Sequence, residues 1–304
     1  MIQLRQLTKR YGRTEAVSDL SFDVRPGVVT GFLGPNGAGK TTTMRMILGL
    51  DAPTSGTATV RGRRYADLPW PMREVGALLD ARAAHPRRSV RGHLLCLARS
   101  NRIARARVEE VIGLVGLSRI ADRPAGALSL GMSQRLGIAA ALLGDPPVLV
   151  FDEPVNGLDP EGVRWIRALM RGLAAEGRTV LVSSHLMSEM ALTAEHLVVI
   201  GRGRLLADTG LDAFVRSDPR DTVLVRTADA EELAHRLRDA GAAVRRDTED
   251  TLVVTGMAGP EIGKVAMVHG VVLHELTPHR TSLEEAYLEL TRTSVEFGGP
   301  EGER

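Results

Sequence analysis

Residues 31–42 read GFLGPNGAGKTT, and this stretch decides the fold of the chain. Gly34, four further residues and then Gly39-Lys40-Thr41 give the spacing of a phosphate-binding loop. The apolar run 28–33 predicts a buried strand before the loop, and the run 41–50 predicts a helix after it. Glycines let successive N–H groups turn towards phosphate oxygens, and the helix N-terminus adds positive potential. We therefore expect a nucleoside triphosphate site; the alternative is a glycine-rich turn that matches by chance.

Two residues of this loop carry specific chemistry. Lys40 brings a compact ammonium to the β- and γ-phosphates, and the hydroxyl of Thr41 is a ligand for Mg²⁺. The chain has 39 basic residues, of which only Lys9, Lys40 and Lys264 are lysines. Arginine cannot replace a compact ammonium inside a phosphate loop. A lysine kept here by a chain that otherwise uses arginine therefore supports the phosphate site.

A second informative stretch, residues 147–154, reads PVLVFDEP. An apolar strand that ends in two acids places Asp152 and Glu153 at its carboxyl end, the edge where open α/β sheets bind ligands. One acid can hold Mg²⁺ while its neighbour orients the attacking water. An ordinary strand that ends at an exposed acidic turn is the alternative, and the phosphate loop argues against it.

The composition excludes several classes of protein. The 304 residues carry a net charge of +2 and no separate basic block, so we expect no nucleic-acid partner. The single cysteine, Cys96, lies in an apolar run and offers no disulfide or metal framework. The start lacks a signal-peptide core, and no apolar run approaches the length of about 18 residues that spans a membrane. We expect a cytoplasmic protein that reaches a membrane only through a partner.

Strands and helices alternate along most of the chain, which predicts an α/β fold with a parallel sheet. Strands are expected at 2–7, 20–24, 57–60, 75–79, 148–151, 179–183, 197–200 and 204–207. Residues 81–144 interrupt this alternation with arginine-rich turns and predicted helices at 89–99, 105–115 and 132–143. This segment is expected to form a helical insert.

A second pattern follows a linker predicted at 217–220. The expected order is strand 222–225, helix 229–240, strands 243–246 and 252–254, helix 260–269 and strand 271–275. That βαββαβ order fits a small ferredoxin-like sandwich. A closing helix is predicted over 282–292, with Ser282 as its cap and Glu285 three residues later. The polar residues that follow are expected to be disordered.

A third stretch, residues 128–135, reads LSLGMSQR and opens the helix before the strand of Asp152. With NGLDP at 156–160 and SSH at 183–185, the set resembles the ATP-binding cassette (ABC) ATPase family, with six motifs in the family's order over residues 2–210. The resemblance implies a P-loop NTPase cassette: a RecA-like parallel sheet, an antiparallel β subdomain and a helical subdomain at about 85–145. The cassette would span 1–216, a C-terminal α+β ferredoxin-like domain 221–293 and a disordered tail 294–304.

The resemblance also implies a role for each motif residue. Asp152 would bind Mg²⁺, Glu153 would be the catalytic base, and His185 would contact the γ-phosphate beside Lys40. The residues that would bind ATP are Tyr11 and Val17 at the adenine, then Gly34, Asn36, Gly37, Ala38, Gly39, Lys40, Thr41 and Thr42 at the phosphates. Ser129 and Gly131 would contact the γ-phosphate held by a second subunit, because a helix N-terminus is an anion site. Asp159 would help to join the two subunits.

Simpler roles remain open for three of these residues. Tyr11 alone fits a surface tyrosine in a turn. His185 fits a loop histidine that caps the helix starting near 186, and Ser129 fits a plain helix cap.

The family pattern is broken at two places, the LSLGM motif and the end of the strand 75–79. The motif LSLGM has Leu130 and Met132 where the commonest form has glycine and glutamine, but it keeps Ser129 and Gly131. At the end of the strand 75–79 the family usually has a glutamine, and here Asp80 follows. Aspartate can still bind Mg²⁺ or water, although it is shorter by one methylene and anionic. An acidic residue at this position also occurs in some exporter branches of the family.

The expected function is therefore the ATP-hydrolysing subunit of an ABC exporter for a drug, antibiotic or lipid-like substrate. The resemblance implies a dimer with a second copy or a related cassette, closed over ATP and Mg²⁺. It also implies a separate membrane permease that docks near residues 80–91 and holds the chain at the inner face of the membrane. The alternatives are a soluble ABC ATPase without transport and a self-resistance protein that sequesters a drug. The transported substrate, the direction of transport and the role of the C-terminal domain lie beyond the sequence.

Overall fold

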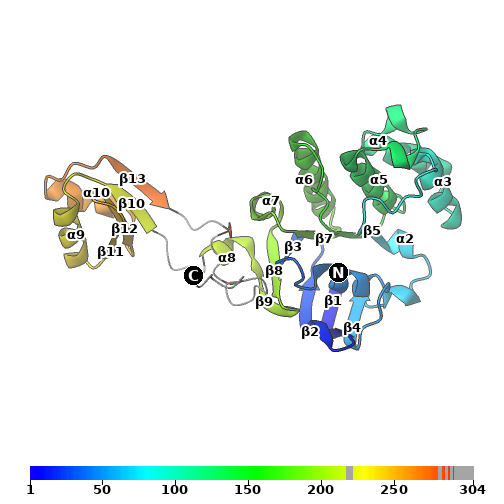
Figure 1. Cartoon of the computed structure of the whole chain (residues 1–304), viewed down its shortest axis with the longest axis horizontal. Helices are drawn as coiled ribbons and strands as arrows, with labels where there is room; N and C mark the ends of the chain where they lie inside the picture. Colours follow the sequence, from blue (N-terminus) through cyan, green and yellow to red (C-terminus); the bar gives the residue numbers. More distant parts are fainter. Residues whose placement is uncertain (217–221, 280–282, 285–286, 288–289, 291–304) are drawn as a thin grey trace, which may run out of the picture. The chain divides into compact units, whose positions relative to one another are not determined.

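A computed structural model describes residues 1–216 and 222–279 and positions 283, 284, 287 and 290 (Figure 1). Contacts divide the chain into two compact units, one containing Met1–Leu211 and the other containing Asp212–Glu289. The linker predicted at 217–220 and the tail predicted from 294 lie outside the described residues, as does most of the helix expected over 282–292.

A six-stranded sheet with the order β5-β6-β7-β3-β8-β9 forms the centre of the first unit. Its strands are β3 (Val29–Leu33), β5 (Val75–Leu78), β6 (Val148–Phe151), β7 (Thr179–Ser184), β8 (His196–Gly201) and β9 (Arg204–Gly210). The pairs from β5 to β8 are parallel, and β9 returns antiparallel to β8. All residues of β3, β6 and β7 are buried, which explains their mostly apolar sequences. Because β3 and β6 end at the same edge, the phosphate loop and the two acids come together there.

A smaller antiparallel sheet with the order β2-β1-β4 packs into the same core. Its strands are β1 (Ile2–Tyr11), β2 (Thr14–Val24) and β4 (Ser55–Val60). The first two strands are longer than the sequence predicts and meet in a tight hairpin, so Tyr11 ends β1. Shifts in the pairing register interrupt the alternation of buried and exposed residues, and the pattern therefore concealed the strand ends.

Helices cover the parallel sheet and form a group beside it (Figure 1). α1 (Lys40–Ile47), α6 (Pro160–Ala175) and α7 (Met187–Thr193) follow β3, β6 and β7. The expected helical insert contains α3 (Val90–Ser100), α4 (Arg105–Leu114) and α5 (Leu130–Leu142), which lie together. The shorter segments are η1 (Tyr65–Asp67), α2 (Pro71–Glu74), η2 (Ser118–Ile120), η3 (Ala125–Ala127) and α8 (Leu211–Arg216), the last at the division between the units. In the part of the chain that the structure describes, no helix is both long and apolar enough to cross a lipid bilayer.

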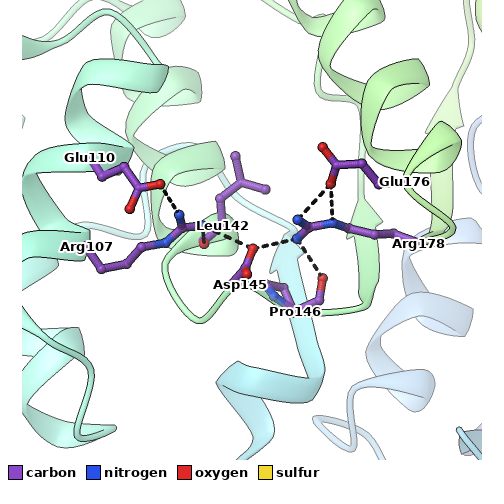
Figure 2. Close-up of polar contacts among 7 residues, drawn as sticks. All are labelled: Arg107, Glu110, Leu142, Asp145, Pro146, Glu176 and Arg178. Atoms are coloured by element: carbon purple, nitrogen blue, oxygen red, sulfur yellow. Dashed lines mark hydrogen bonds and ion pairs between the residues drawn. The ribbon is translucent and has the colours of Figure 1, made fainter.

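Asp145 connects the helical insert to the sheet through two arginines (Figure 2). Its Oδ1 lies 2.8 Å from Nη1 of Arg178, directly before β7, and 3.3 Å from Nη2 of Arg107 on α4. Arg107 also donates to the carbonyl of Leu142 at 3.0 Å and pairs with Glu110 at 2.6 Å. These contacts hold the turn between α5 and β6, and so they set where the strand of the two acids begins.

The second unit is a four-stranded antiparallel sheet with the order β11-β12-β10-β13. Its strands are β10 (Thr222–Arg226), β11 (Ala243–Arg246), β12 (Thr251–Thr255) and β13 (Glu275–His279), and its helices are α9 (Ala230–Asp239) and α10 (Gly259–Val268). Apolar residues of both helices and of the strands share one core. This topology confirms the predicted ferredoxin-like arrangement.

The prediction of a strand at 271–275 is wrong, because the last strand covers Glu275–His279. Val271 belongs instead to the turn after α10, since its N–H donates to the carbonyl of Ala266 at 2.9 Å. The carbonyl of Val272 accepts a hydrogen bond of 2.7 Å from the hydroxyl of Thr227. The N–H of Val271 and the carbonyl of Val272 are therefore not free to pair with a neighbouring strand.

Candidate functional site

The phosphate loop joins β3 to α1 and borders a cavity of about 330 Å³. Its backbone requires glycine at two points. A Cβ on Gly34 would lie 2.6 Å from the carbonyl oxygen of Ile200, and a Cβ on Gly39 would lie 2.6 Å from that of Ala16. Gly39 also has a φ of +101°, which favours glycine. We call this space the phosphate cavity; it is lined by Ala16, Leu79, Asp152, Glu153 and residues 35–42.

Lys40 is folded back onto the loop that carries it. Its Nζ donates to the carbonyl oxygens of Gly34 at 2.5 Å and Pro35 at 3.2 Å, and the residue is only 7% exposed. Burial lowers the pKa of Lys40, while the charges of Glu153 and Asp152 act against this shift. The ammonium is thus poorly solvated, and an incoming phosphate would provide a stronger partner than the two carbonyls.

Thr41 and Asp152 meet across the phosphate cavity. The hydroxyl of Thr41 donates to Oδ2 of Asp152 at 2.7 Å, and Oδ1 of Asp152 accepts from the hydroxyl of Ser183. A hydroxyl and a carboxylate side by side are suitable ligands for Mg²⁺ together with phosphate oxygens. Among the described residues no group of three His, Cys, Asp or Glu side chains could hold a metal ion.

Glu153 follows Asp152 in an unusual backbone conformation. Its φ is +50°, in the left-handed region that non-glycine residues rarely adopt. Its N–H donates to the hydroxyl of Ser183 at 2.9 Å, and its carbonyl accepts from Nε2 of Gln134 at 2.9 Å. Its side chain lies on the border of the phosphate cavity, where Oε2 is 2.8 Å from Nδ1 of His185.

His185 stands directly after β7, with about half of its side chain exposed. The hydrogen bond at the start of α7 is made by Ser184, whose hydroxyl accepts from the N–H of Leu186 at 3.0 Å. The alternative of His185 as a helix cap is therefore wrong: its ring contacts Glu153 instead.

Ser129 and Asp159 are exposed residues that precede α5 and α6, Gly131 lies in the first turn of α5, and none of the three lines the phosphate cavity. Ser129 caps α5 by accepting from the N–H of Met132 at 3.2 Å, and Asp159 caps α6 by accepting from the N–H of Gly162 at 2.7 Å. Gly131 packs against the loop that follows Glu153, since a Cβ on it would lie 2.7 Å from the carbonyl of Gly157. Ser129 is thus a helix cap. The N-terminal end of α5 is also exposed to solvent at Ser129 and Leu130.

Three further predicted residues are not among those that line the phosphate cavity. Tyr11 is 49% exposed, and its hydroxyl donates to Oδ2 of Asp51 at 2.9 Å. Val17 is fully buried in the core beneath Gly39. Asp80 borders a different, mostly apolar cavity, and its Oδ1 accepts from the N–H of Arg82 at 2.8 Å. Roles for these residues in binding adenine or metal stay predictions.

Two buried polar residues at this site were not singled out from the sequence. Ser183 is fully buried and Gln134 is 3% exposed, and both contact the acids at the end of β6. The available signals were a hydroxyl residue at the end of an apolar strand and a glutamine on the buried face of α5. Neither signal identifies its partner, which lies 30 residues away for Ser183 and 19 for Gln134.

Comparison with known proteins gives consistent matches. Residues 17–156 match the family model described as ABC transporter. The bacitracin transport ATP-binding protein BcrA of Bacillus licheniformis is 40% identical over 70% of this chain and 70% of its own length. The uncharacterized ABC transporter ATP-binding protein YhcH of Bacillus subtilis is 34% identical over 97% of both chains. The Nod factor export ATP-binding protein I of Burkholderia orbicola is 40% identical over 71% of this chain and 73% of its own.

Solved structures resemble the first unit. The dimeric structure of MJ0796, a bacterial ABC transporter cassette, matches with a TM-score of 0.64 and 26% identity over 69% of this chain and 99% of that one. The structure of an ATP-binding subunit of an ABC transporter matches with a TM-score of 0.66 and 27% identity, over 71% of this chain and 92% of that one. Residues 221–284 match a model described as a domain of unknown function (DUF8746).

Proposed function

Since the chain belongs to the ATP-binding cassette (ABC) transporter family, and is an ATPase as that family's cassettes are, we propose that it powers export of a drug or antibiotic through a separate membrane permease. The relatives named for bacitracin transport, lantibiotic transport and Nod factor export motivate this substrate class. The observation that carries the proposal is the meeting of Thr41 and Asp152 at 2.7 Å on the phosphate cavity.

In this proposal the phosphate cavity holds the phosphates of ATP together with Mg²⁺. Residues 34–42 supply backbone N–H groups and the N-terminus of α1, and Lys40 supplies the charge. Thr41 and Asp152 would hold the metal ion, which neutralises charge on the phosphates when bound. Tyr11 would stack on the adenine, because its exposed ring ends the hairpin of β1 and β2.

Glu153 is the proposed catalytic base. Its carboxylate borders the phosphate cavity, so it can accept a proton from a water molecule that attacks the γ-phosphate. His185 would keep that carboxylate in place through its Nδ1 contact and would present Nε2 to the phosphate. Glu153→Gln should bind ATP, hydrolyse it very slowly and accumulate as an ATP-bound dimer in size-exclusion chromatography. Unchanged turnover would remove Glu153 from this role.

The outward-facing ends of α5 and α6 support a dimer with shared sites. Ser129 and Gly131 would complete the γ-phosphate site of the opposite subunit, and Asp159 would lie at the contact between subunits. The structural relative MJ0796 was solved as a dimer. The second subunit would be another copy of this chain or a related cassette.

A cleft of about 320 Å³ in the first unit is the proposed docking site of the permease. Its lining is mostly apolar and comes from both the sheet and the helical insert, including Leu48, Tyr65, Asp80, His93 and Leu136. A short amphipathic helix of a membrane protein would bury its apolar face there. This contact would hold the chain at the cytoplasmic face of the membrane.

The second unit is proposed as an accessory domain over residues 221–293, after a cassette that spans 1–216. It would steady the dimer or regulate it.

Co-expression with the membrane protein of the neighbouring gene provides the test of export. We expect the two proteins to co-purify, and the pair to raise the concentration of drug that the host tolerates, whereas Lys40→Ala should abolish this gain. An active ATPase that co-purifies with no membrane protein and gives no resistance would favour the soluble ATPase instead. Resistance that survives Lys40→Ala would favour drug sequestration.

A further inference from the structure

The backbone of Glu153 is held at both of its polar atoms by buried side chains. Its N–H donates to the hydroxyl of Ser183 and its carbonyl accepts from the amide of Gln134, both at 2.9 Å. Ser183 is fully buried and Gln134 is 3% exposed, so neither contact competes with solvent. The two side chains come from different elements, β7 and α5.

The chemistry of the groups fixes the direction of each hydrogen bond. A carbonyl oxygen can only accept, so Gln134 must present its NH₂ group to Glu153. The carboxylate of Asp152 can also only accept, so the single hydroxyl hydrogen of Ser183 goes to Asp152, and its lone pair receives the N–H of Glu153. One serine therefore orients both acids at the end of β6.

Gln134 keeps this contact although its other amide atom remains unsatisfied. Its Oε1 is buried without a hydrogen-bond partner among the described residues. A buried polar atom without a partner destabilises a fold, so the position would favour an apolar residue if packing alone mattered. The amide therefore serves the bond to Glu153.

These contacts matter because Glu153 has a φ of +50°. A left-handed conformation at a residue with a Cβ costs free energy and persists only where its surroundings hold it. The same torsion decides where the side chain points, here to His185 and the phosphate cavity.

We infer that Ser183 and Gln134 are positioning residues that hold Glu153 in this conformation and so aim its carboxylate at the attacking water. The inference rests on the proposed role of Glu153 as the base. Gln134 lies on α5, whose first turn carries Gly131, so a displacement of that helix end by a second subunit also reaches Glu153.

The decisive variant is Gln134→Met, which keeps the length of the side chain and removes the donor. Because this variant changes only the orientation of the Glu153 carboxylate, kcat for ATP hydrolysis should fall roughly tenfold or more while KM for ATP stays unchanged. Ser183→Ala should lower kcat in the same way, and Ser183→Thr, which keeps a hydroxyl, should restore most of it.

The matched controls are Ser133→Ala, a buried hydroxyl on α5, and Thr30→Val, a buried hydroxyl on β3 whose Oγ1 has no partner among the described residues. Both controls should leave kcat unchanged.

A second measurement separates positioning from a structural role. In a Glu153→Gln background, adding Gln134→Met should leave ATP-dependent dimer formation unchanged, as judged by size-exclusion chromatography. It should also cause no further loss of turnover, because the carboxylate that it would misplace is already gone.

The outcomes are distinct. Normal kcat in Gln134→Met and Ser183→Ala, with an inactive Glu153→Gln, would overturn the inference and leave the proposed function standing. Loss of dimer formation in the double variant would also overturn it, since Gln134 would then support the fold of α5. Full turnover by Glu153→Gln would overturn the proposed role of Glu153 itself.

Discussion

The hydroxyl of Thr41 lies 2.7 Å from Oδ2 of Asp152, although 111 residues separate them in the chain. The bond joins the start of α1 to the end of β6, and it brings together two oxygen ligands of the kind that Mg²⁺ prefers. The phosphate loop and the acids that follow β6 are therefore in direct contact.

Replacing Thr41 tests this relationship. In Thr41→Val the shape is kept and the hydroxyl is lost, so the Mg²⁺ concentration that gives half-maximal ATPase activity should rise roughly tenfold or more, because even indirect partners of a metal contribute that much to affinity. Thr41→Ser keeps the hydroxyl and should stay close to the parent. A Mg²⁺ titration of ATPase activity measures both, and equal requirements in the two variants would contradict the metal role.

The buried ammonium of Lys40 predicts that nucleotide binding is coupled to proton uptake. Burial lowers its pKa from the ordinary value of 10.5, whereas bound phosphate would favour the charged form and raise the pKa again. ATP binding at alkaline pH, just below 10.5, should therefore take up protons. Calorimetry in buffers of different ionisation enthalpy measures this uptake. The same measurement near neutral pH, where less of the free ammonium is deprotonated, should show a smaller uptake. Equal uptake at both pH values would assign the proton to another group.

Shared active sites predict complementation between two inactive variants. Lys40→Ala disables the phosphate loop, and Ser129→Arg blocks the helix end that would serve the opposite subunit. A mixed dimer contains one intact loop facing one intact helix end, so mixing the proteins should restore part of the ATPase activity. Absence of activity at every mixing ratio would show that the sites are not built from two subunits.

The position of Asp80 predicts that its replacement will abolish transport without abolishing ATP hydrolysis. Because Asp80 borders the apolar cleft and not the phosphate cavity, Asp80→Ala should keep basal ATPase activity and lose drug export with the permease present. Efflux and ATPase measured on the same preparation check this. Retention of both activities would make Asp80 a bystander, and loss of basal hydrolysis would instead favour a metal contact.

Replacement of Asp145 should cause a modest loss of thermal stability. Its side chain is 61% exposed, so the pairs with Arg107 and Arg178 contribute only about 1 kcal/mol each at most. Its φ of +52° adds a preference for aspartate or asparagine. Asp145→Ala should therefore lower the thermal midpoint by about 2–4 °C, and Asp145→Asn by less. Differential scanning fluorimetry measures the difference, and high salt should shrink it. A larger loss in Asp145→Asn than in Asp145→Ala would contradict this account.

Most of the fold followed from the order of apolar runs, because buried parallel strands and amphipathic helices have distinct local patterns. The errors fall where local pattern and tertiary contact disagree. Residues 271–275 read as a strand, yet the N–H of Val271 bonds back to the carbonyl of Ala266 on α10, and the strand begins where pairing with β10 becomes possible. The hairpin of β1 and β2 extends to Tyr11. The sequence pattern did not predict this length, because register shifts interrupt the alternation of buried and exposed residues.

The sequence by itself determined the phosphate loop, the two acids after β6 and the motif at the start of α5. These are short segments whose chemistry depends on neighbouring residues, such as glycines that permit a turn or a strand that ends in carboxylates. Only the tertiary structure decided which distant groups meet. It places Ser183 and Gln134 on the backbone of Glu153 and His185 on its carboxylate. It also places Asp80 at a cavity other than the phosphate cavity. A hydrogen bond between residues far apart in the chain leaves no local pattern, because it depends on how sheet and helices pack.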